Sequence, residues 1–275
     1  MICEACGEEN PLQQRYHALC QPDHEPFSET GETPFDMELK GDLLDVIRWA
    51  HNTTARSEQV ALGCSEAGHP CERRVAMTMA GVQAVNFPDP WPSIVGTAVH
   101  TWMERAITRY EAAHGIADWL TELEIVPSQF LPGHCDLYHE EKRTVLDWKF
   151  PGETNFKKFR DEGWDHHDQY KTQLHLYGKG IKMSGRPVER VGLVVLRREG
   201  WLTNIIVKTA PFDETIADDA IARVMEIGKS LIAQDIPDSG AWAKVPASPD
   251  YMTCTFCPYF RGGTEEADST GCPGK

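Results

Sequence analysis

Two aspartates and a lysine near the middle of the sequence have the types and spacing that metal-assisted chemistry requires. Asp136 lies on one predicted strand, and the next predicted strand ends in Asp147, Trp148 and Lys149 after the turn HEEKR. Neighbouring antiparallel strands bring the two carboxylates together, and the two-residue repeat of a strand puts Asp147 and Lys149 on one face, opposite Trp148. Carboxylates in such a pocket hold Mg²⁺ or Mn²⁺, which polarises a phosphate and acidifies a bound water, while the ammonium stabilises developing charge. The set is therefore suited to phosphodiester hydrolysis.

The elements that must position these residues follow from the spacing of apolar side chains. Helical spacing predicts helices over residues 42–55, 95–114 and 213–234, and another within 165–183 that ends near Gly178 or Gly180. Alternating patterns bounded by turn residues predict strands over 121–130, 133–140, 143–150, 188–199 and 202–210. We expect the first three strands to form an antiparallel meander. This order of helices and strands indicates one α/β domain.

Length, composition and charge set the broad class of protein. A chain of 275 residues suits one main domain with small appendages, and 41% hydrophobic with 25% charged residues is ordinary for a globular protein. The absence of a long apolar run and the polar N-terminus predict a cytoplasmic protein without a membrane span. The net charge of -15 argues against nonspecific coating of nucleic acid. An acidic protein still binds DNA when its basic residues line one groove and a metal offsets its site carboxylates.

The motifs around the two aspartates resemble those of the RecB-type branch of PD-(D/E)XK nucleases. GHCD and LDWKF resemble the GxxD and DxK motifs, Gly96 and His100 fit a GxxxH motif, and Gln173 and Tyr177 fit a QxxxY motif. All occur in family order on the predicted types of element, across roughly residues 60–275. The resemblance implies a restriction-endonuclease-like α/β core, in which helices flank a mixed sheet.

The same resemblance implies a role for each motif residue. His100, Asp136 and Asp147 would bind the divalent metal, and Lys149 would stabilise charge or activate the reaction. Gln173 and Tyr177 would line the site and help to orient the lysine and the DNA backbone. The sequence leaves other positions open: Glu124 adds a ligand or faces solvent, and His166 and His167 approach DNA phosphate or belong to a solvated helix start.

The nine cysteines form clusters, which in a chain without a secretion signal predict metal ligands rather than disulfides. Cys254, Cys257 and Cys272 provide three thiolates, and Cys71 in HPCERR resembles a family Cys-x-Arg element. This arrangement, with one N-terminal cysteine and three C-terminal cysteines, resembles that of the iron-sulfur RecB-like nucleases, including AddB-type helicase-nucleases and CRISPR-associated exonucleases. It implies a structural [4Fe-4S] cluster on these four cysteines, although the interval from Cys257 to Cys272 is longer than usual. Structural zinc on the same thiolates, and Cys64 in place of Cys71, remain open.

A second cysteine cluster opens the chain. Cys3, Cys6, His17 and Cys20 have the spacing of a small Zn²⁺ module that resembles treble-clef or LIM-like knuckles, with His24 as an alternative to His17. Such knuckles grip DNA or protein, and a purely structural cap is the other interpretation. We therefore expect a zinc knuckle over residues 1–25, a linker rich in Pro, Gly, Ser and Thr over 26–41, and a nuclease domain over 42–275.

The sequence therefore favours a Mg²⁺- or Mn²⁺-dependent deoxyribonuclease. The family resemblance favours an exonuclease on DNA ends or single strands, acting in recombination, repair, phage DNA metabolism or CRISPR adaptation with a recombination or CRISPR partner protein. The alternative is a noncatalytic DNA-binding or assembly protein on the same scaffold, with two structural metal sites. The intact set of Asp136, Asp147 and Lys149 disfavours that alternative, because a protein that cuts nothing has no need of all three.

Overall fold

The computed structural model describes residues 33–53, 62–87, 89–163, 167–232, 241–248, 254–262 and 271–274. The chain divides into two compact units, Met1–Gln59 and Val60–Lys275. The zinc knuckle expected over residues 1–25 and His166 lie outside the described residues, so both remain predictions. No helix among the described residues is long and apolar enough to cross a membrane.

In the first unit, the described residues form α1 (Pro34–Asn52), and this helix begins inside the segment that we expected to be a linker. A capping box explains the early start: the Thr33 hydroxyl accepts a hydrogen bond from the backbone of Asp36, and the Asp36 carboxylate accepts one from the backbone of Thr33 at 2.9 Å. Pro34 occupies a first-turn position, where its fixed φ suits a helix. The helix expected from residue 42 therefore starts earlier, at Pro34, and the first unit ends at Gln59.

The second unit is built on a five-stranded sheet in the order β1-β2-β3-β4-β5. The strands are β1 (Trp119–Ser128), β2 (Leu131–His139), β3 (Thr144–Lys149), β4 (Arg190–Val195) and β5 (Ile206–Pro211). The first three strands pair antiparallel, as the predicted meander requires, β3 and β4 pair parallel, and β5 returns antiparallel. The predicted α/β class with a mixed sheet is therefore confirmed. The sequence 202–204 forms the short 3-10 helix η2 rather than the start of the last strand.

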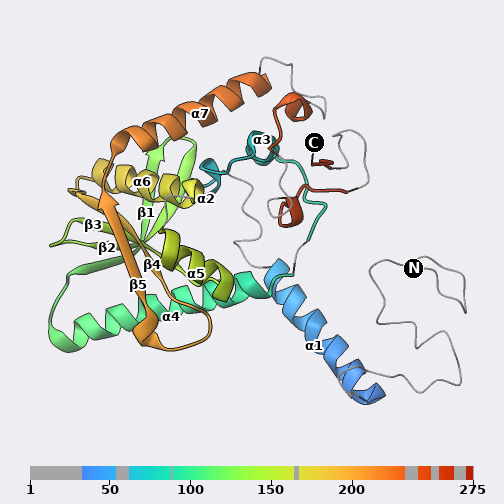
Figure 1. Ribbon diagram of the computed structural model, residues 1–275, viewed down its shortest axis with the longest axis horizontal. Helices are drawn as coiled ribbons and strands as arrows, with labels where there is room; N and C mark the ends of the chain where they lie inside the picture. Colours follow the sequence, from blue (N-terminus) through green and yellow to red (C-terminus); the bar gives the residue numbers. More distant parts are fainter. Residues whose placement is uncertain are drawn as a thin grey trace, which may run out of the picture. The chain divides into compact units, whose positions relative to one another are not determined.

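Helices cover the two faces of this sheet (Figure 1). The helices of the second unit are α2 (Cys64–Ala67), α3 (Glu72–Met79), α4 (Trp91–His114), α5 (Glu153–Glu162), α6 (Asp168–Met183), α7 (Glu214–Ile232) and the 3-10 helix η3 (Ala241–Lys244). α6 packs across β1, β3 and β4 and carries α7 on its outer side, while α4 packs against β1. The parallel β3 and β4 are connected through α5 and α6, because parallel neighbours require a crossover.

The sequence predicted that this helix ends near Gly178 or Gly180. In the structure α6 continues to Met183. Both glycines are buried positions of close packing. A Cβ at Gly178 would lie 2.6 Å from the Phe212 ring, and a Cβ at Gly180 would lie 2.7 Å from Cβ of Ile125. The glycines therefore let α6 approach the sheet and the segment before α7, which is why they occur inside a helix.

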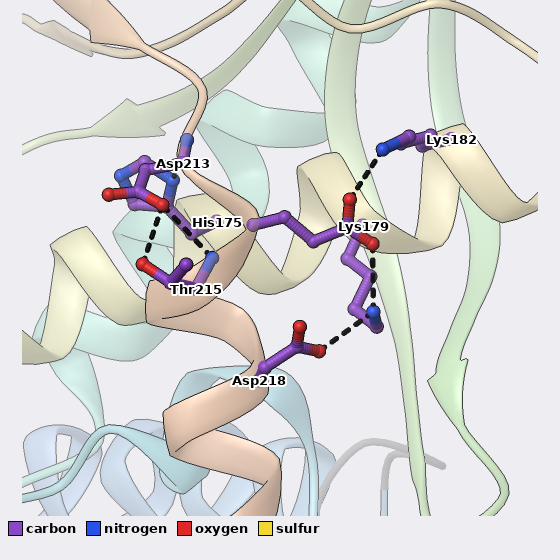
Figure 2. A network of polar contacts seen from close by, with 7 residues as sticks. His175, Lys179, Lys182, Asp213, Thr215 and Asp218 are labelled. Atoms are coloured by element: carbon purple, nitrogen blue, oxygen red, sulfur yellow. Dashed lines mark hydrogen bonds and ion pairs between the residues drawn. The ribbon is translucent and has the colours of Figure 1, made fainter.

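Polar contacts fix α6 against the start of α7 (Figure 2). The Lys179 ammonium lies 2.9 Å from a Glu214 carboxylate oxygen and 2.8 Å from an Asp218 carboxylate oxygen, and Lys182 also pairs with Glu214. Nearby, Nδ1 of the buried His175 accepts a hydrogen bond from the backbone of Asp213. These contacts hold the outer face of α6, so its inner face is presented to the sheet.

Candidate active site

The two aspartates come together where β2 and β3 diverge. Leu137 pairs with Leu146 at the end of the β2–β3 ladder, so the next positions on the two strands are Asp136 and Asp147. The Asp136 side chain replaces the missing ladder bond, since its Oδ2 accepts a hydrogen bond of 3.0 Å from the backbone of Trp148. The side chains of Asp136 and Asp147 are 11% and 2% exposed. The predicted carboxylate pair is therefore close to buried at the edge of the ladder.

Lys149 completes this group from the end of β3. Its ammonium forms an ion pair with Oδ2 of Asp147 and lies 4.7 Å from the centre of the Tyr170 ring. Trp148 belongs to the smaller apolar cluster that includes Ile107 of α4, on the other side of the sheet. Asp147 and Lys149 therefore share one face of β3, and Trp148 lies on the other face.

Gln173 and Tyr177 reach Asp147 from the inner face of α6. Nε2 of Gln173 donates to Oδ1 of Asp147 at 3.1 Å and to the Tyr177 hydroxyl at 2.7 Å. The two residues are one helical turn apart, which puts their side chains on the same face. Both are buried, so this chain of hydrogen bonds fixes the orientation of the Asp147 carboxylate.

His100 approaches the opposite side of the pair from α4. Its Nδ1 lies 3.4 Å from Oδ2 of Asp136, and its ring packs edge-on against Phe150 at 5.5 Å between centroids. Gly96, one turn earlier, has no heavy atom within 4 Å of an ideal Cβ position. His100 therefore contacts Asp136, and Lys149 and Gln173 contact Asp147, while Tyr177 is joined to Asp147 through Gln173.

Glu122 on β1 also belongs to the site, although the sequence reasoning missed it. Ligand atoms of His100, Glu122 and Asp136 all lie within 4.8 Å of one another, so the three form a candidate metal-binding group. Glu124, which the sequence had left open, is 89% exposed and lies 3.8 Å from His134. The signal that identifies Glu122 is its position in the β1–β2 register, which single-sequence reasoning does not supply.

Burial and neighbouring charges shift the pKa values of the site. Burial, and then the Asp147 carboxylate, raise the pKa of Asp136 well above its usual range. Burial alone would lower the pKa of Lys149, but the carboxylates of Asp147 and Asp136 outweigh it, so this pKa is raised and the side chain is an ammonium. Burial, and then Asp147, raise the pKa of Tyr177, which keeps the phenol protonated. Burial and the neighbouring Asp147 thus disfavour the charged form of Asp136.

A separate pocket brings together the cysteines near the C-terminus and one from the start of the second unit. It is lined by Cys71, Cys254, Cys257 and Cys272 together with His69, Arg74, Met77, Ala247, Phe260 and Gly274. All four cysteines are free thiols. Residues separated by about two hundred positions in the chain therefore meet in one pocket.

The structure distinguishes Cys71 from Cys64. Cys64 is buried against β2, where its sulfur lies 3.7 Å from the backbone oxygen of Leu131, and it does not line the pocket. Arg73, in the sequence HPCERR, places Nη1 3.6 Å from the sulfur of Cys272. His167 lies elsewhere, stacked on Phe159 with 4.5 Å between ring centroids.

Comparisons with known proteins give a weak likeness in structure. No protein-family model and no curated protein matches this sequence. The chain is similar to an alkaline exonuclease (LHK-Exo) from Laribacter hongkongensis, with 14% identity over 50% of this chain and 67% of that chain and a TM-score of 0.37. The same exonuclease in complex with dAMP gives 15% identity, the same coverage and the same TM-score.

A third structural neighbour is a phage-related exonuclease from Haemophilus somnus 129PT. It has 15% identity to this chain over 63% of this chain and 96% of that chain, with a TM-score of 0.44. The structural neighbours are thus exonucleases at low identity. Because all three TM-scores are below 0.5, the function of this chain is inferred below from its own side chains.

Proposed function

We propose that this chain is a divalent-metal-dependent deoxyribonuclease whose reaction takes place at Asp136, Asp147 and Lys149. The observation that carries the proposal is the contact network in which one buried carboxylate, Asp147, contacts both the Lys149 ammonium and the Gln173 amide. Asp136 lies next to it and contacts His100. DNA as the substrate follows from the resemblance of the four motifs to RecB-type nucleases, and so does the preference for ends or single strands.

The donor set fits a divalent metal. Carboxylate oxygens of Asp136 and Asp147, and a ring nitrogen of His100, are donors that Mn²⁺ and Mg²⁺ accept. When bound there, the ion would supply polarisation of the phosphate and a more acidic water. Burial and the neighbouring Asp147 carboxylate raise the pKa of Asp136. A bound cation would favour the charged carboxylate and so act against that shift.

The other residues act on the scissile phosphate and on one another. The Lys149 ammonium stabilises negative charge on the phosphate, and Asp147 holds the ammonium in place through the ion pair. The Tyr170 ring, 4.7 Å from Nζ, borders the other side of the same ammonium and limits where it can move. Gln173, backed by the Tyr177 hydroxyl, prevents the Asp147 carboxylate from rotating away.

A cleavage assay tests this function. Wild-type protein with Mn²⁺ is expected to degrade end-labelled DNA, and Lys149→Met and Asp136→Asn are each expected to lower the rate about 100-fold or more. Lys182→Met is the matched control, because Lys182 pairs with Glu214 on the outer face of α6. Linear and circular substrates in parallel report whether ends are required. Wild-type protein that binds DNA without cutting it would instead support the noncatalytic alternative.

We further propose that Cys71, Cys254, Cys257 and Cys272 hold a structural [4Fe-4S] cluster. The four cysteines line one pocket, which gives a cofactor four thiolate ligands. Four thiolates suit either a [4Fe-4S] cluster or tetrahedral zinc. The resemblance of one N-terminal and three C-terminal cysteines to the iron-sulfur RecB-like nucleases favours the cluster. The cluster would join the start and the end of the second unit.

A further inference from the structure

Glu122 lies directly across the sheet from Asp136. Leu123 pairs with Cys135 in the β1–β2 ladder, so the preceding residue, Glu122, falls opposite Asp136. On its other side, Asp136 falls opposite Asp147 where the β2–β3 ladder ends. Three adjacent strands therefore place three carboxylates in one row.

The carboxylates of this row repel one another. Like charges directly opposite each other on neighbouring strands are destabilising. Lys149 pairs with Asp147, and Nδ1 of His100 lies 3.4 Å from Oδ2 of Asp136. A divalent cation bound among the carboxylates would reduce their repulsion.

The backbone at Glu122 supports a role for its side chain. Its φ is 50°, in the left-handed region that a residue other than glycine rarely occupies. Such strain persists where the surroundings hold it in place, and it is concentrated at functional sites. Here the left-handed conformation occurs at the residue whose carboxylate lies within 4.8 Å of ligand atoms of His100 and Asp136.

We propose that Glu122 is a direct ligand of the divalent ion, together with His100 and Asp136. This inference rests on the proposed nuclease site and adds to it a ligand from β1. The three ligand atoms come from α4, β1 and β2, so the ion would tie the helix to the sheet. One ring nitrogen among oxygen donors suits Mn²⁺ better than Mg²⁺, which prefers oxygen ligands and keeps several waters. Mn²⁺ is therefore the probe of choice.

The test is a titration of the metal-free, full-length protein with Mn²⁺, in which the EPR signal of free Mn²⁺ reports binding. Glu122→Gln is expected to weaken binding about tenfold or more, since even residues that only orient metal ligands contribute about tenfold to 100-fold. Glu124→Gln is the matched control, because Glu124 lies on the same strand with its side chain 89% exposed. It is expected to bind Mn²⁺ like the wild type.

Thermal unfolding gives a second readout that separates a ligand from a structural residue. Glu122→Gln removes like-charge repulsion, so the metal-free variant is expected to unfold at the same temperature as the wild type or higher. Added Mn²⁺ is then expected to raise its Tm less than it raises that of the wild type. A purely structural role predicts the reverse: a lower Tm without metal and an unchanged response to Mn²⁺.

Asp136→Asn separates failure of this inference from failure of the proposed function. If Asp136→Asn loses Mn²⁺ binding while Glu122→Gln binds like the wild type, Glu122 is not a ligand and the nuclease site stands. If the wild type binds no Mn²⁺, or Asp136→Asn binds it unchanged, the metal site itself is refuted and the inference with it.

Discussion

Asp147 is the residue through which the candidate site is organised. Its two oxygens have different partners: Oδ1 accepts from Gln173, and Oδ2 pairs with Lys149. Because the side chain is 2% exposed, water cannot replace a partner that is removed. The position of the lysine therefore depends on a glutamine that lies on another element.

Replacing Gln173 tests this dependence at the scale of one residue. Gln173→Leu would leave Oδ1 of Asp147 without its donor, and a buried polar group without a partner costs about 1–3 kcal/mol. We expect a decrease of that size in the free energy of unfolding, measured in urea without metal. Tyr177→Phe keeps the bond between Gln173 and Asp147, so its loss should be smaller.

The control is Gln169→Leu on the same helix. Gln169 donates to the backbone oxygen of Ser65 at an exposed position, where water can take over that bond. Its effect should therefore stay within about 0.5 kcal/mol. Equal losses for Gln169→Leu and Gln173→Leu would contradict the importance assigned to the bond with Asp147.

At the scale of elements, α6 is the helix that connects the site with the core. Its inner face carries Gln173 and Tyr177, and its glycines allow the close approach that brings those side chains to β3. Its outer face is held by the ion pairs with α7 (Figure 2). The distance between α6 and the sheet therefore determines whether the amide of Gln173 reaches Asp147.

A pair of glycine substitutions tests this packing. Gly180→Ala would place a Cβ 2.7 Å from Cβ of Ile125, and overpacking of this kind costs about 1–3 kcal/mol. Gly96→Ala, inside α4 with no heavy atom within 4 Å of the new Cβ, should instead stabilise by about 0.5–1 kcal/mol. Urea unfolding of the two variants measures the expected loss and the expected gain in the free energy of unfolding. A neutral Gly180→Ala would show that α6 can move away from β1 at no cost.

At the scale of the second unit, the cysteine pocket joins distant parts of the chain. Arg73 adds to this junction, because its Nε donates to the backbone oxygen of Val245 at 2.9 Å and its backbone nitrogen donates to that of Pro246. The segment before α4 is thus bound to the segments after α7. A cofactor on the four thiolates would strengthen the same junction.

Loss of that cofactor is expected to destabilise the second unit. Cys257→Ser should lose iron and the broad visible absorption of a cubane, and its Tm should fall by several degrees, because cofactor binding contributes to folding. Iron content and absorption of anaerobically purified protein measure the first effect, and thermal unfolding measures the second. Cys64→Ala should keep its iron, since Cys64 lies outside the pocket. Colourless wild-type protein containing only zinc would refute the iron-sulfur proposal.

Much of the site could be predicted from the sequence because its geometry is local. The two-residue repeat of a strand places Asp147 and Lys149 together, and the helical repeat places Gln173 four positions before Tyr177. The short turn between β2 and β3 makes these strands neighbours, which brings Asp136 to Asp147. The spacing of apolar residues likewise predicted the order of the main helices and strands.

Tertiary structure decided what depends on segments far apart in the chain. Only the register of β1 against β2 selects Glu122 rather than Glu124, and only the packing of α6 explains why it continues through Gly178 and Gly180. The choice of Cys71 over Cys64 also depends on where the C-terminal cysteines lie. Repeats along the chain fix which side chains share a face, because backbone geometry repeats over a few residues. Which faces meet is determined by long-range packing, and no local pattern encodes it.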